Sequence, residues 1–372
     1  MFAHYCLPHT GGVETVVEAM CTRLATRHRV TLVSTDWNGL QGAERAGQRT
    51  TWRLPAHHGI ERLGIPYPIS KRSALTAVAL AEVAEADVIH VHGALYAQST
   101  QARRVARRFG TPLVLTEHVG WVPYPSRTVR VAQAAAWRLI GDTTLRQASA
   151  VVALNERVRD WLTARVPSCA AAMLPNGVDF TRFPRGDAAA RAAARLVVGL
   201  PPGQRLGLFV GRDAPKKHRA EVLSGHREGW TLVLAGATRR IVAPGVIDLG
   251  IVEAERMPLL YQACDFLVHL AEGEGFPMAV QESMASGLPV ALRWDPGYAS
   301  TLDRDAVSAG DTMADTMAAA DALAVDAGRR ERLGGAGHAW ATTHWSWDAT
   351  VAAYEAIYAR VTSARALRGS PA

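Results

Sequence analysis

The sequence has few cysteines and no long apolar run. Its four cysteines lie far apart without a CxxC spacing, so neither a disulfide framework nor a zinc site is expected, and a reducing cytoplasm fits best. A membrane-spanning helix needs about 18 uncharged apolar residues. The most apolar stretch, 74–97, is interrupted by three acidic residues and excludes such a helix. The first residues lack a basic segment before an apolar one, so no signal peptide is expected.

The chain is also poor in lysine, and its positive charge is unevenly distributed. Only Lys71, Lys216 and Lys217 are present, and the other basic residues are arginine. Residues 1–183 hold 21 basic and 13 acidic side chains, whereas residues 184–372 hold 20 and 21. A basic half beside a neutral half indicates that the first half meets an anionic partner or surface.

Short apolar runs alternate with amphipathic segments along all 372 residues. Such runs are typical of strands buried on both faces of a parallel sheet. The expected strands are 2–7, 30–34, 88–92, 113–118, 150–155, 206–211, 232–236, 246–250, 266–270 and 289–292. The expected helices are 13–24, 155–165, 187–198, 278–286, 312–326 and 346–361. This order predicts two doubly wound α/β domains, 1–183 and 184–345, followed by a C-terminal helix and tail, 346–372.

Two glycines, Gly11 and Gly12, stand where the first expected strand gives way to the first helix. In an open α/β sheet, ligands bind at the carboxyl ends of the strands. Glycine lets the backbone approach a ligand closely, and a helix N-terminus offers free N–H groups. The alternative is a turn that requires a positive φ. A dinucleotide site is not indicated, because the GxGxxG pattern is absent.

A basic loop follows the strand expected at 206–211. Arg212 and Lys217 lie close together in the sequence after Gly211, at this strand end. They can converge on a diphosphate, arginine through bidentate hydrogen bonds and lysine as a point charge. The alternative is a solvated basic turn.

Two glutamates, Glu274 and Glu282, are separated by seven residues after the strand expected at 266–270. Gly275 and Phe276 directly follow the first of them. The second falls inside an apolar helix, where a buried carboxylate is costly unless it accepts hydrogen bonds. Ribose hydroxyls are such donors, and a surface position for Glu282 is the alternative.

Taken in order, these segments resemble the retaining, metal-independent GT-B glycosyltransferases of glycosyltransferase family 4, over nearly the whole length. Glu274 and Glu282 match the E-x7-E motif of that family. Gly211, Arg212 and Lys217 match its Gly-Arg…Lys element, and Gly11-Gly12 match its glycine-rich first loop. Further matches are 87–93, 116–118, 175–179 and 344–347.

The resemblance implies an α/β GT-B fold: two Rossmann-like domains with a cleft between them and a C-terminal helix that returns to the first domain. The first domain would bind the acceptor and the second the nucleotide sugar. Arg212 and Lys217 would hold the donor diphosphate and neutralise the leaving group. The residues that would bind the rest of the donor are Gly11, Gly12, Gly211, Gly275, Phe276 and, at the ribose, Glu282. Glu274 would contact the transferred sugar, and His118 would lie near its anomeric carbon.

The implied reaction moves a sugar from a nucleoside diphosphate sugar to a hydroxyl acceptor with retention of configuration. No cofactor, metal ion or nucleic acid is implied. His218 stands where the family usually has glycine, and the stretch that follows Lys217 is short. An alternative is therefore a degenerate member that binds nucleotide sugar or a partner protein without turnover. A nucleotide-sugar epimerase of the same fold would lack the Glu274…Glu282 arrangement.

Segment 121–146 is expected to carry a basic helix face. This face holds Arg127, Arg130 and Arg138, and its expected amphipathic anchors are Trp121, Tyr124 and Trp137. The pattern predicts a peripheral contact with an anionic membrane surface, at the inner face of the membrane. The alternative is an ordinary solvated helix face.

Two histidines, His90 and His92, point to the same face of an expected strand, as metal ligands would. No third ligand follows at a suitable spacing in the sequence. No metal site is therefore expected.

Overall fold

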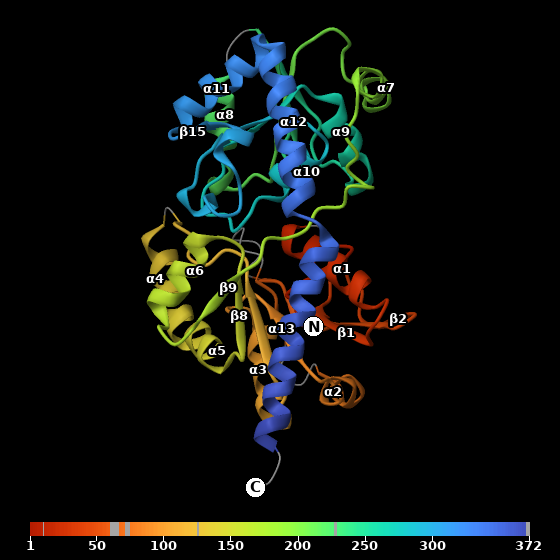
Figure 1. The fold of residues 1–372 in the computed structure, drawn as a ribbon, viewed down its shortest axis with the longest axis vertical. Coiled ribbons are helices and arrows are strands. Elements are labelled where there is room, and N and C mark those ends of the chain that lie inside the picture. Colours follow the sequence, from red (N-terminus) through yellow and green to blue (C-terminus); the bar gives the residue numbers. More distant parts are fainter. Residues whose placement is uncertain (10, 60–66, 71–74, 125, 227–228, 370–372) are drawn as a thin grey trace. The chain divides into compact units, whose positions relative to one another are not determined.

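The structure is a computed structural model that describes residues 1–369 except 10, 60–66, 71–74, 125 and 227–228 (Figure 1). The chain divides into two compact units. Unit 1 comprises Met1–Asn176 and Trp347–Ala372, and unit 2 comprises Gly177–Ser346. Each unit is built on a mainly parallel sheet with helices, which confirms the predicted α/β class. Among the described helices, none combines the length and apolarity that crossing a membrane requires.

The sheet of unit 1 has two parts, in the strand orders β1-β3-β2 and β6-β7-β8-β9, with a short β4-β5 pair beside them. Its strands are β1 (Val30–Thr35), β2 (Gly42–Ala46), β3 (Arg49–Leu54), β4 (Ala56–His57), β5 (Ile69–Ser70), β6 (Ile89–His92), β7 (Leu113–Glu117), β8 (Ala150–Ala153) and β9 (Ala171–Met173). Phe2 joins the two parts through parallel bridges to Val33 and Val91. The expected strand over 2–7 is therefore wrong in length, since Phe2 alone forms a bridge.

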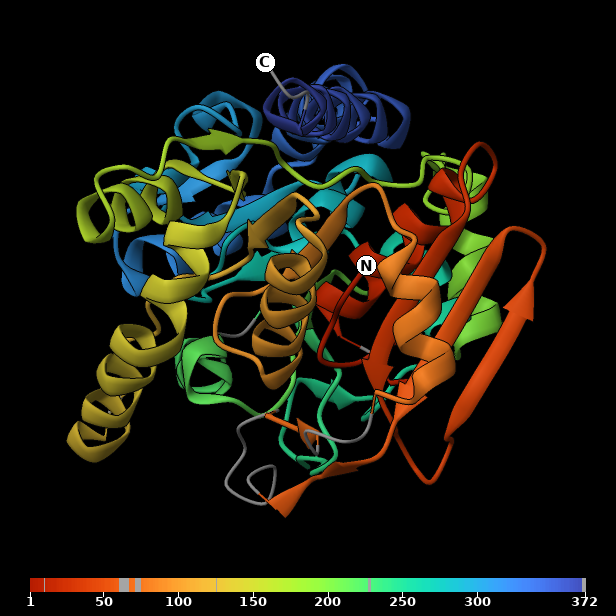
Figure 2. The ribbon, with the colours of Figure 1, turned by 90° about the horizontal axis from the view of Figure 1, so that it is seen from below.

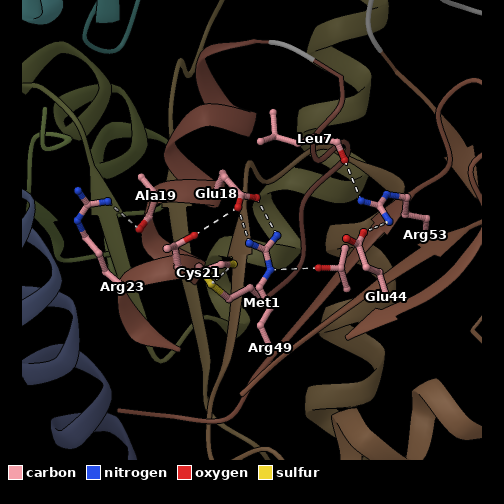
Figure 3. Close-up of polar contacts among 11 residues, drawn as sticks. Met1, Leu7, Glu18, Ala19, Cys21, Arg23, Glu44, Arg49 and Arg53 are labelled. Carbon is pink, nitrogen blue, oxygen red and sulfur yellow. Dashed lines mark hydrogen bonds and ion pairs between the residues drawn. The ribbon is translucent and has the colours of Figure 1, made fainter. Parts of the chain in front are cut away.

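The antiparallel hairpin β2–β3 has no counterpart in the sequence expectations. All residues of β2 are exposed, so no apolar run marks it. It forms the outer edge of the sheet, as the red-orange arrows of Figure 2 show. Its side chains nevertheless contact the chain on both sides of the glycines (Figure 3): Arg53 donates to the Leu7 carbonyl oxygen at 3.0 Å, and Arg49 donates to both carboxylate oxygens of Glu18 in the first helix.

The helices of unit 1 are α1 (Gly12–Leu24), α2 (Ala77–Ala84), α3 (Ala97–Phe109), α4 (Arg127–Ala136), α5 (Asp142–Gln147), α6 (Glu156–Arg165) and α13 (Trp347–Gly369). Helix α13 belongs to unit 1, as predicted, and contacts α1 (Figure 1). The guanidinium of Arg23 lies over the Trp347 ring, and the Tyr354 hydroxyl bonds Thr116 at 3.0 Å. The C-terminal helix thus packs on β7.

The segment 121–146 differs from its expectation at Trp137. This side chain is 1% exposed, belongs to the hydrophobic core and lies edge-on to Trp161. It begins a π-helical turn, Trp137–Gly141, whose last residue has no side chain to obstruct the indole ring. Trp137 is therefore not a membrane anchor. Helix α4 itself buries no residue.

The sheet of unit 2 is parallel throughout, in the order β12-β11-β10-β13-β14-β15. Its strands are β10 (Leu206–Val210), β11 (Thr231–Ala235), β12 (Val246–Asp248), β13 (Phe266–His269), β14 (Val290–Arg293) and β15 (Ser308–Gly310). Its helices are α7 (Ala188–Val198), α8 (Arg219–Gly225), α9 (Met257–Ala263), α10 (Met278–Ala285), α11 (Met313–Val325) and α12 (Ala327–His344). Every residue of β13 is buried, as expected for a central parallel strand.

Candidate functional site

In unit 2, the two charged segments singled out in the sequence lie beside each other. Strands β10 and β13 pair in parallel, with Leu208 opposite Leu267, so their carboxyl ends meet at one edge of the sheet. The backbone N–H of Glu272 donates to the carbonyl oxygen of Lys216 at 2.9 Å. This bond joins the loop after β10 to the loop after β13.

A buried ion pair forms where these loops meet. Lys217 Nζ lies 2.6 Å from Glu274 Oε1, and Lys216 Nζ lies 3.5 Å from the same oxygen. His269 Nε2 is 3.7 Å from the other oxygen of Glu274. Burial alone would raise the pKa of Glu274, but the two lysines and His269 hold it well below its usual range. The carboxylate is therefore ionised and fixes the Lys217 ammonium at the strand end.

Arg212 precedes this pair in the same loop. Its side chain is exposed and makes no hydrogen bond or ion pair with any described residue, so its guanidinium faces solvent. Gly211 donates to the Ala235 carbonyl oxygen at 2.9 Å and lies against Gly236, which has a φ of +106°. A Cβ on Gly236 would come within 3.0 Å of the Gly211 oxygen. Sequence reasoning missed Gly236, although it ends an expected strand.

His218 shows why the family favours glycine at this position. It has a φ of +55°, in the left-handed region that glycine enters at least cost. Its Nδ1 lies 3.1 Å from Glu221 and its Nε2 lies 3.4 Å from Glu272. Helix α8, which starts directly after it, is only 7 residues long. Lys217 is thus paired with Glu274 although the residue after it is not glycine.

The turn after Glu274 is buried. Phe276 is 5% exposed, and its ring lies edge-on to Tyr298 and Trp345, at centroid distances of 5.6 and 5.0 Å. Pro277 caps helix α10, so Gly275 and Phe276 lie directly before its N-terminus. Aromatic packing therefore fixes the backbone of this turn beside Glu274.

Glu282 lies on α10 and has its own partner. Its side chain is partly buried, and the hydroxyl of Tyr261 on α9 donates to Oε2 at 2.8 Å. Burial raises the pKa of Glu282 to about 7, although the Tyr261 hydrogen bond and the charge of Arg182 oppose the rise. The alternative of a surface position is therefore wrong. Sequence reasoning missed Tyr261, because no local spacing links it to Glu282.

In unit 1, Gly11 and Gly12 lie at the start of α1, where Gly11 is the N-cap. The φ of Gly11 is −171°, an extended conformation, and Gly12 begins the helix, so neither glycine is required by a positive φ. The carboxylate of Glu14 instead folds back over Gly11, where a Cβ would lie 2.4 Å from its Oε2. His9 Nδ1 lies 2.9 Å and His4 Nε2 lies 3.4 Å from Glu14 Oε1.

His118 follows β7 and is buried against a second histidine. Its Nε2 lies 3.0 Å from Nδ1 of His92, at the end of the neighbouring strand β6. Burial, together with the nearby charge of His4, lowers the pKa of His118 to about 4. Both rings are therefore neutral near pH 7, since burial also lowers the pKa of His92. Among the described residues, no group of three or more His, Cys, Asp or Glu side chains is placed to hold a metal.

The predicted site residues thus form two sets, each within its own unit. Lys217 and Glu274 are in contact, Arg212, Gly211, Gly275 and Phe276 lie in the same two loops, and Glu282 is on the following helix. Gly11 and Gly12 begin α1, and His118 lies at the end of β7. The neighbours that sequence reasoning did not assign are His4, His9, Glu14, Tyr261 and His269. Of these, His9 and Glu14 flank the glycine pair, which was the available signal.

Comparison with known proteins gives matches over most of the chain. A model described as Glycosyltransferase Family 4 matches residues 10–182, and one described as Glycosyl transferases group 1 matches residues 191–324. A GDP-mannose-dependent alpha-(1-6)-phosphatidylinositol monomannoside mannosyltransferase of Mycolicibacterium smegmatis is 26% identical, with 91% of this chain and 92% of the relative covered. A D-inositol 3-phosphate glycosyltransferase of Xylanimonas cellulosilytica is 30% identical, over 76% of this chain and 74% of the relative. The crystal structure of Anabaena HepE in complex with UDP and glucose superposes with a TM-score of 0.72 at 15% identity, over 96% of this chain and 98% of that one.

Proposed function

Because the chain belongs to glycosyltransferase family 4 and has the GT-B fold, we propose that it transfers a sugar from a nucleoside diphosphate sugar to a hydroxyl group of an acceptor. We further propose that the anomeric configuration is retained and that no metal ion is required. The observation that carries the proposal is the fixed Lys217–Glu274 pair beside the exposed Arg212 in unit 2. We assign these residues to the binding of the sugar donor.

The two cations would act on the diphosphate of the donor. Cleavage of the bond between sugar and phosphate leaves negative charge on the phosphate oxygens. Preorganised positive charge at that position stabilises the transition state without reorganising when the charge develops. Lys217 is held by Glu274, and Arg212 has no protein partner among the described residues to release before it binds an anion. This pair of charges would do what a divalent metal does in metal-dependent transferases.

The two glutamates would bind the neutral parts of the donor. The second carboxylate oxygen of Glu274 lies 3.7 Å from His269, and it would accept hydrogen bonds from hydroxyls of the transferred sugar. Glu282 would accept bonds from the ribose hydroxyls, with Tyr261 holding its carboxylate in place. The fixed backbone of Gly275 and Phe276 would approach the donor at the start of α10.

His118 would contact the sugar rather than remove a proton. Its lowered pKa makes it a weak base, and its Nε2 is already hydrogen-bonded to His92. In a retaining reaction the acceptor oxygen attacks from the side of the leaving group. The acceptor proton then passes to the departing phosphate oxygen, the bond from the anomeric carbon to that oxygen breaks, and the new glycosidic bond forms on the same face.

The names of the relatives suggest where to look for substrates. The mannosyltransferase relative is named for GDP-mannose and a phosphatidylinositol monomannoside, and the second relative for D-inositol 3-phosphate. HepE was crystallised with UDP and glucose. GDP-mannose in the first name and UDP in the HepE complex both contain a nucleoside diphosphate, and both relatives are named for a compound that contains inositol phosphate. We propose an acceptor of this anionic, hydroxyl-rich class for the basic unit 1.

The first test measures the binding of UDP, GDP, ADP and dTDP through the shift of the thermal unfolding temperature. Each nucleotide is tested once with magnesium and once with a chelator. A ligand at 100 times its dissociation constant stabilises the native state by about 2.7 kcal/mol. We expect one nucleotide to stabilise the protein equally in both conditions. The matching nucleotide sugars would then be tested for transfer, and proton NMR of the product would report its anomeric configuration. Binding without any turnover would instead support a degenerate, non-catalytic family member, and no binding would refute the donor site.

We also propose that segment 121–146 contacts an anionic membrane surface, as the lipid acceptor named for one relative would require. Exposed apolar and basic side chains support this: Val131 is 62% and Leu139 is 75% exposed, and Arg127 and Arg138 are exposed beside them. Replacing both arginines by glutamine should reduce sedimentation with phosphatidylglycerol vesicles and leave nucleotide binding unchanged. Equal sedimentation of variant and parent would refute the contact.

A further inference from the structure

Unit 1 contains a small arginine-lined pocket away from the proposed site. Its volume is about 210 Å³, and its walls are Arg103, Arg104 and Arg107 of α3 together with Gln147, the last residue of α5. The two helices contact each other, so these side chains come from two packed elements. Guanidinium and amide N–H groups are all hydrogen-bond donors, so the pocket favours an acceptor-rich guest.

The guanidinium groups of this pocket have no counter-charge in the described part of the chain. None of the three arginine side chains makes a hydrogen bond or ion pair with a residue that the structure describes. The Nε of Arg103 is buried and has no hydrogen-bond partner there. Burial and the charges of Arg104 and Arg107 lower the pKa of Arg103. A buried donor without a partner and like charges held close together are both unfavourable, and a bound anion would relieve both.

The helix dipole does not account for these residues. Cations near the C-terminus of a helix are stabilised, but the effect fades beyond the last turn. This explains Arg107 and Arg108, which occupy the last turn of α3. Arg103 lies six residues before the end of the helix, beyond that range. Like charges spaced by four residues, as in Arg103 and Arg107, also destabilise a helix.

The pocket lies at the opposite end of the sheet from His118. Helix α3 ends shortly before β7 begins, and Gln147 lies shortly before β8, so the pocket is near the amino ends of these strands. His118 follows the carboxyl end of β7. A five-residue strand spans about 17 Å, so one small ligand does not reach both places.

We propose that this pocket is a binding site for a phosphate-bearing anion, separate from the donor and acceptor positions of the transfer reaction. Arg103 and Arg107 would hold phosphate oxygens through charge-assisted hydrogen bonds, with Arg104 and Gln147 completing the donor set. The phosphate belongs either to a soluble molecule or to a lipid headgroup, since both present the same oxygens.

The test follows hydrogen exchange of the backbone in residues 97–109 and 142–147 during titration with inorganic phosphate at constant ionic strength. A second arm uses phosphatidylcholine vesicles with and without phosphatidic acid. The variant is Arg103→Gln with Arg107→Gln. The matched control is Arg108→Gln with Arg146→Gln, which removes the same charge from exposed neighbours outside the pocket. We expect protection in the parent, an apparent affinity about ten-fold weaker in the pocket variant and nearly unchanged in the control.

Protection by inorganic phosphate assigns the pocket to a soluble ligand. Protection by phosphatidic acid vesicles alone assigns it to a lipid headgroup. In either case, selective loss in the pocket variant supports the proposal. No protection by either probe, or equal weakening in the pocket variant and the control, overturns it.

Discussion

The two units carry opposite chemistry at equivalent places in their sheets. At the carboxyl edge of the unit 2 sheet, Lys217 is paired with an ionised Glu274, and Arg212 faces solvent. At the carboxyl edge of the unit 1 sheet, buried histidines lie beside acidic side chains such as Glu14 and Glu117, and burial lowers the pKa of His92 and His118. The edge of unit 2 thus holds fixed cations, and we call it the charged edge. The edge of unit 1 holds neutral imidazoles and no such cation among the described residues, and we call it the neutral edge.

This difference shows how a common architecture can serve two kinds of ligand. Fixed charges suit a diphosphate, whose own charge grows as the bond to the sugar breaks. Neutral imidazoles donate and accept single hydrogen bonds, which suits hydroxyl groups. The Glu14 carboxylate beside Gly11 is ionised, because hydrogen bonding from His9 and the charges of His4 and His9 offset its burial and lower its pKa to about 2. Negative charge at that glycine turn opposes an unaccompanied anion there.

The largest effect is expected when the charged edge of unit 2 loses its fixed cation, Lys217. Lys217→Ala should lower kcat by about 10²–10³, the usual cost of removing one preorganised group that stabilises transition-state charge. Lys216→Ala is the matched control, because its ammonium lies farther from Glu274, at 3.5 Å, and its loop-bridging carbonyl remains. We expect a loss of a few-fold in the control. Steady-state rates with the donor identified by the nucleotide panel measure both, and similar losses would contradict the special role of Lys217.

Acid should weaken the neutral edge more than the charged one. A buried histidine with a lowered pKa binds fewer protons in the native than in the unfolded state between about pH 6.5 and its native pKa. Its stabilising contribution is complete above pH 6.5 and is lost as the pH falls toward 4. His118 and His269, whose pKa is lowered to about 4, each contribute up to about 3 kcal/mol by this linkage. Burial lowers the pKa of His90, His92 and His118 in unit 1, and of His226 and His269 in unit 2.

Hydrogen exchange resolved by unit, corrected for intrinsic rates, should therefore show a larger loss of protection in unit 1 than in unit 2 between pH 7 and pH 5. His92→Gln combined with His118→Asn should flatten the dependence in unit 1 alone. Equal pH dependence of the two units would contradict the comparison.

Much of this contrast between the two edges was predictable from the sequence. The part that was not depends on which strands lie next to each other in the fold. Lys217 and Glu274 follow apolar strands, so the sheet rule placed both at one edge, although their contact depends on β10 and β13 being neighbours. His92 and His118 are far apart in sequence, and only the pairing of β6 with β7 brings them together. Linear spacing therefore found no third histidine beside His90 and His92.

Prediction of the helices and strands was limited in the same way, since only elements with a local sequence pattern were expected. Continuous apolar runs identified the central parallel strands in both units. The exposed hairpin strand β2 lacks an apolar face, and α12 contains several glycines, so neither produced a local signal. The contact of Tyr261 with Glu282 could not be predicted from the sequence either, because it joins two different helices.

A smaller effect is expected within the charged edge, where the two glutamates differ. The pKa of Glu282 is about 7, so its carboxyl is mainly protonated at pH 6 and mainly ionised at pH 8. In the ribose-binding role that we propose for Glu282, only the ionised form accepts bonds from both hydroxyls, and apparent affinity scales with the competent fraction. Nucleotide affinity should therefore rise about ten-fold from pH 6 to pH 8 in the parent. Calorimetry at both pH values should show that Glu282→Gln loses this rise. The control Glu274→Gln should keep it, because the carboxyl of Glu274 is ionised at both pH values in the parent. A rise that persists in Glu282→Gln would show that another group causes it.

The smallest effect concerns His218, which lies between Lys217 and the start of α8. His218 pays a conformational cost of about 1 kcal/mol for its left-handed backbone, which glycine avoids. Its contacts with Glu221 and Glu272 are partly exposed ion pairs, which contribute at most about 1 kcal/mol. His218→Gly removes both the strain and the contacts and should change the free energy of unfolding of unit 2 by less than about 1 kcal/mol. His218→Ala removes the contacts but keeps the strain, so it should be less stable than His218→Gly by about 1 kcal/mol in urea unfolding. Glu274 rather than His218 holds Lys217, so both variants should keep kcat within about two-fold of the parent. A large loss of kcat in either variant would show that the backbone at residue 218 positions the lysine.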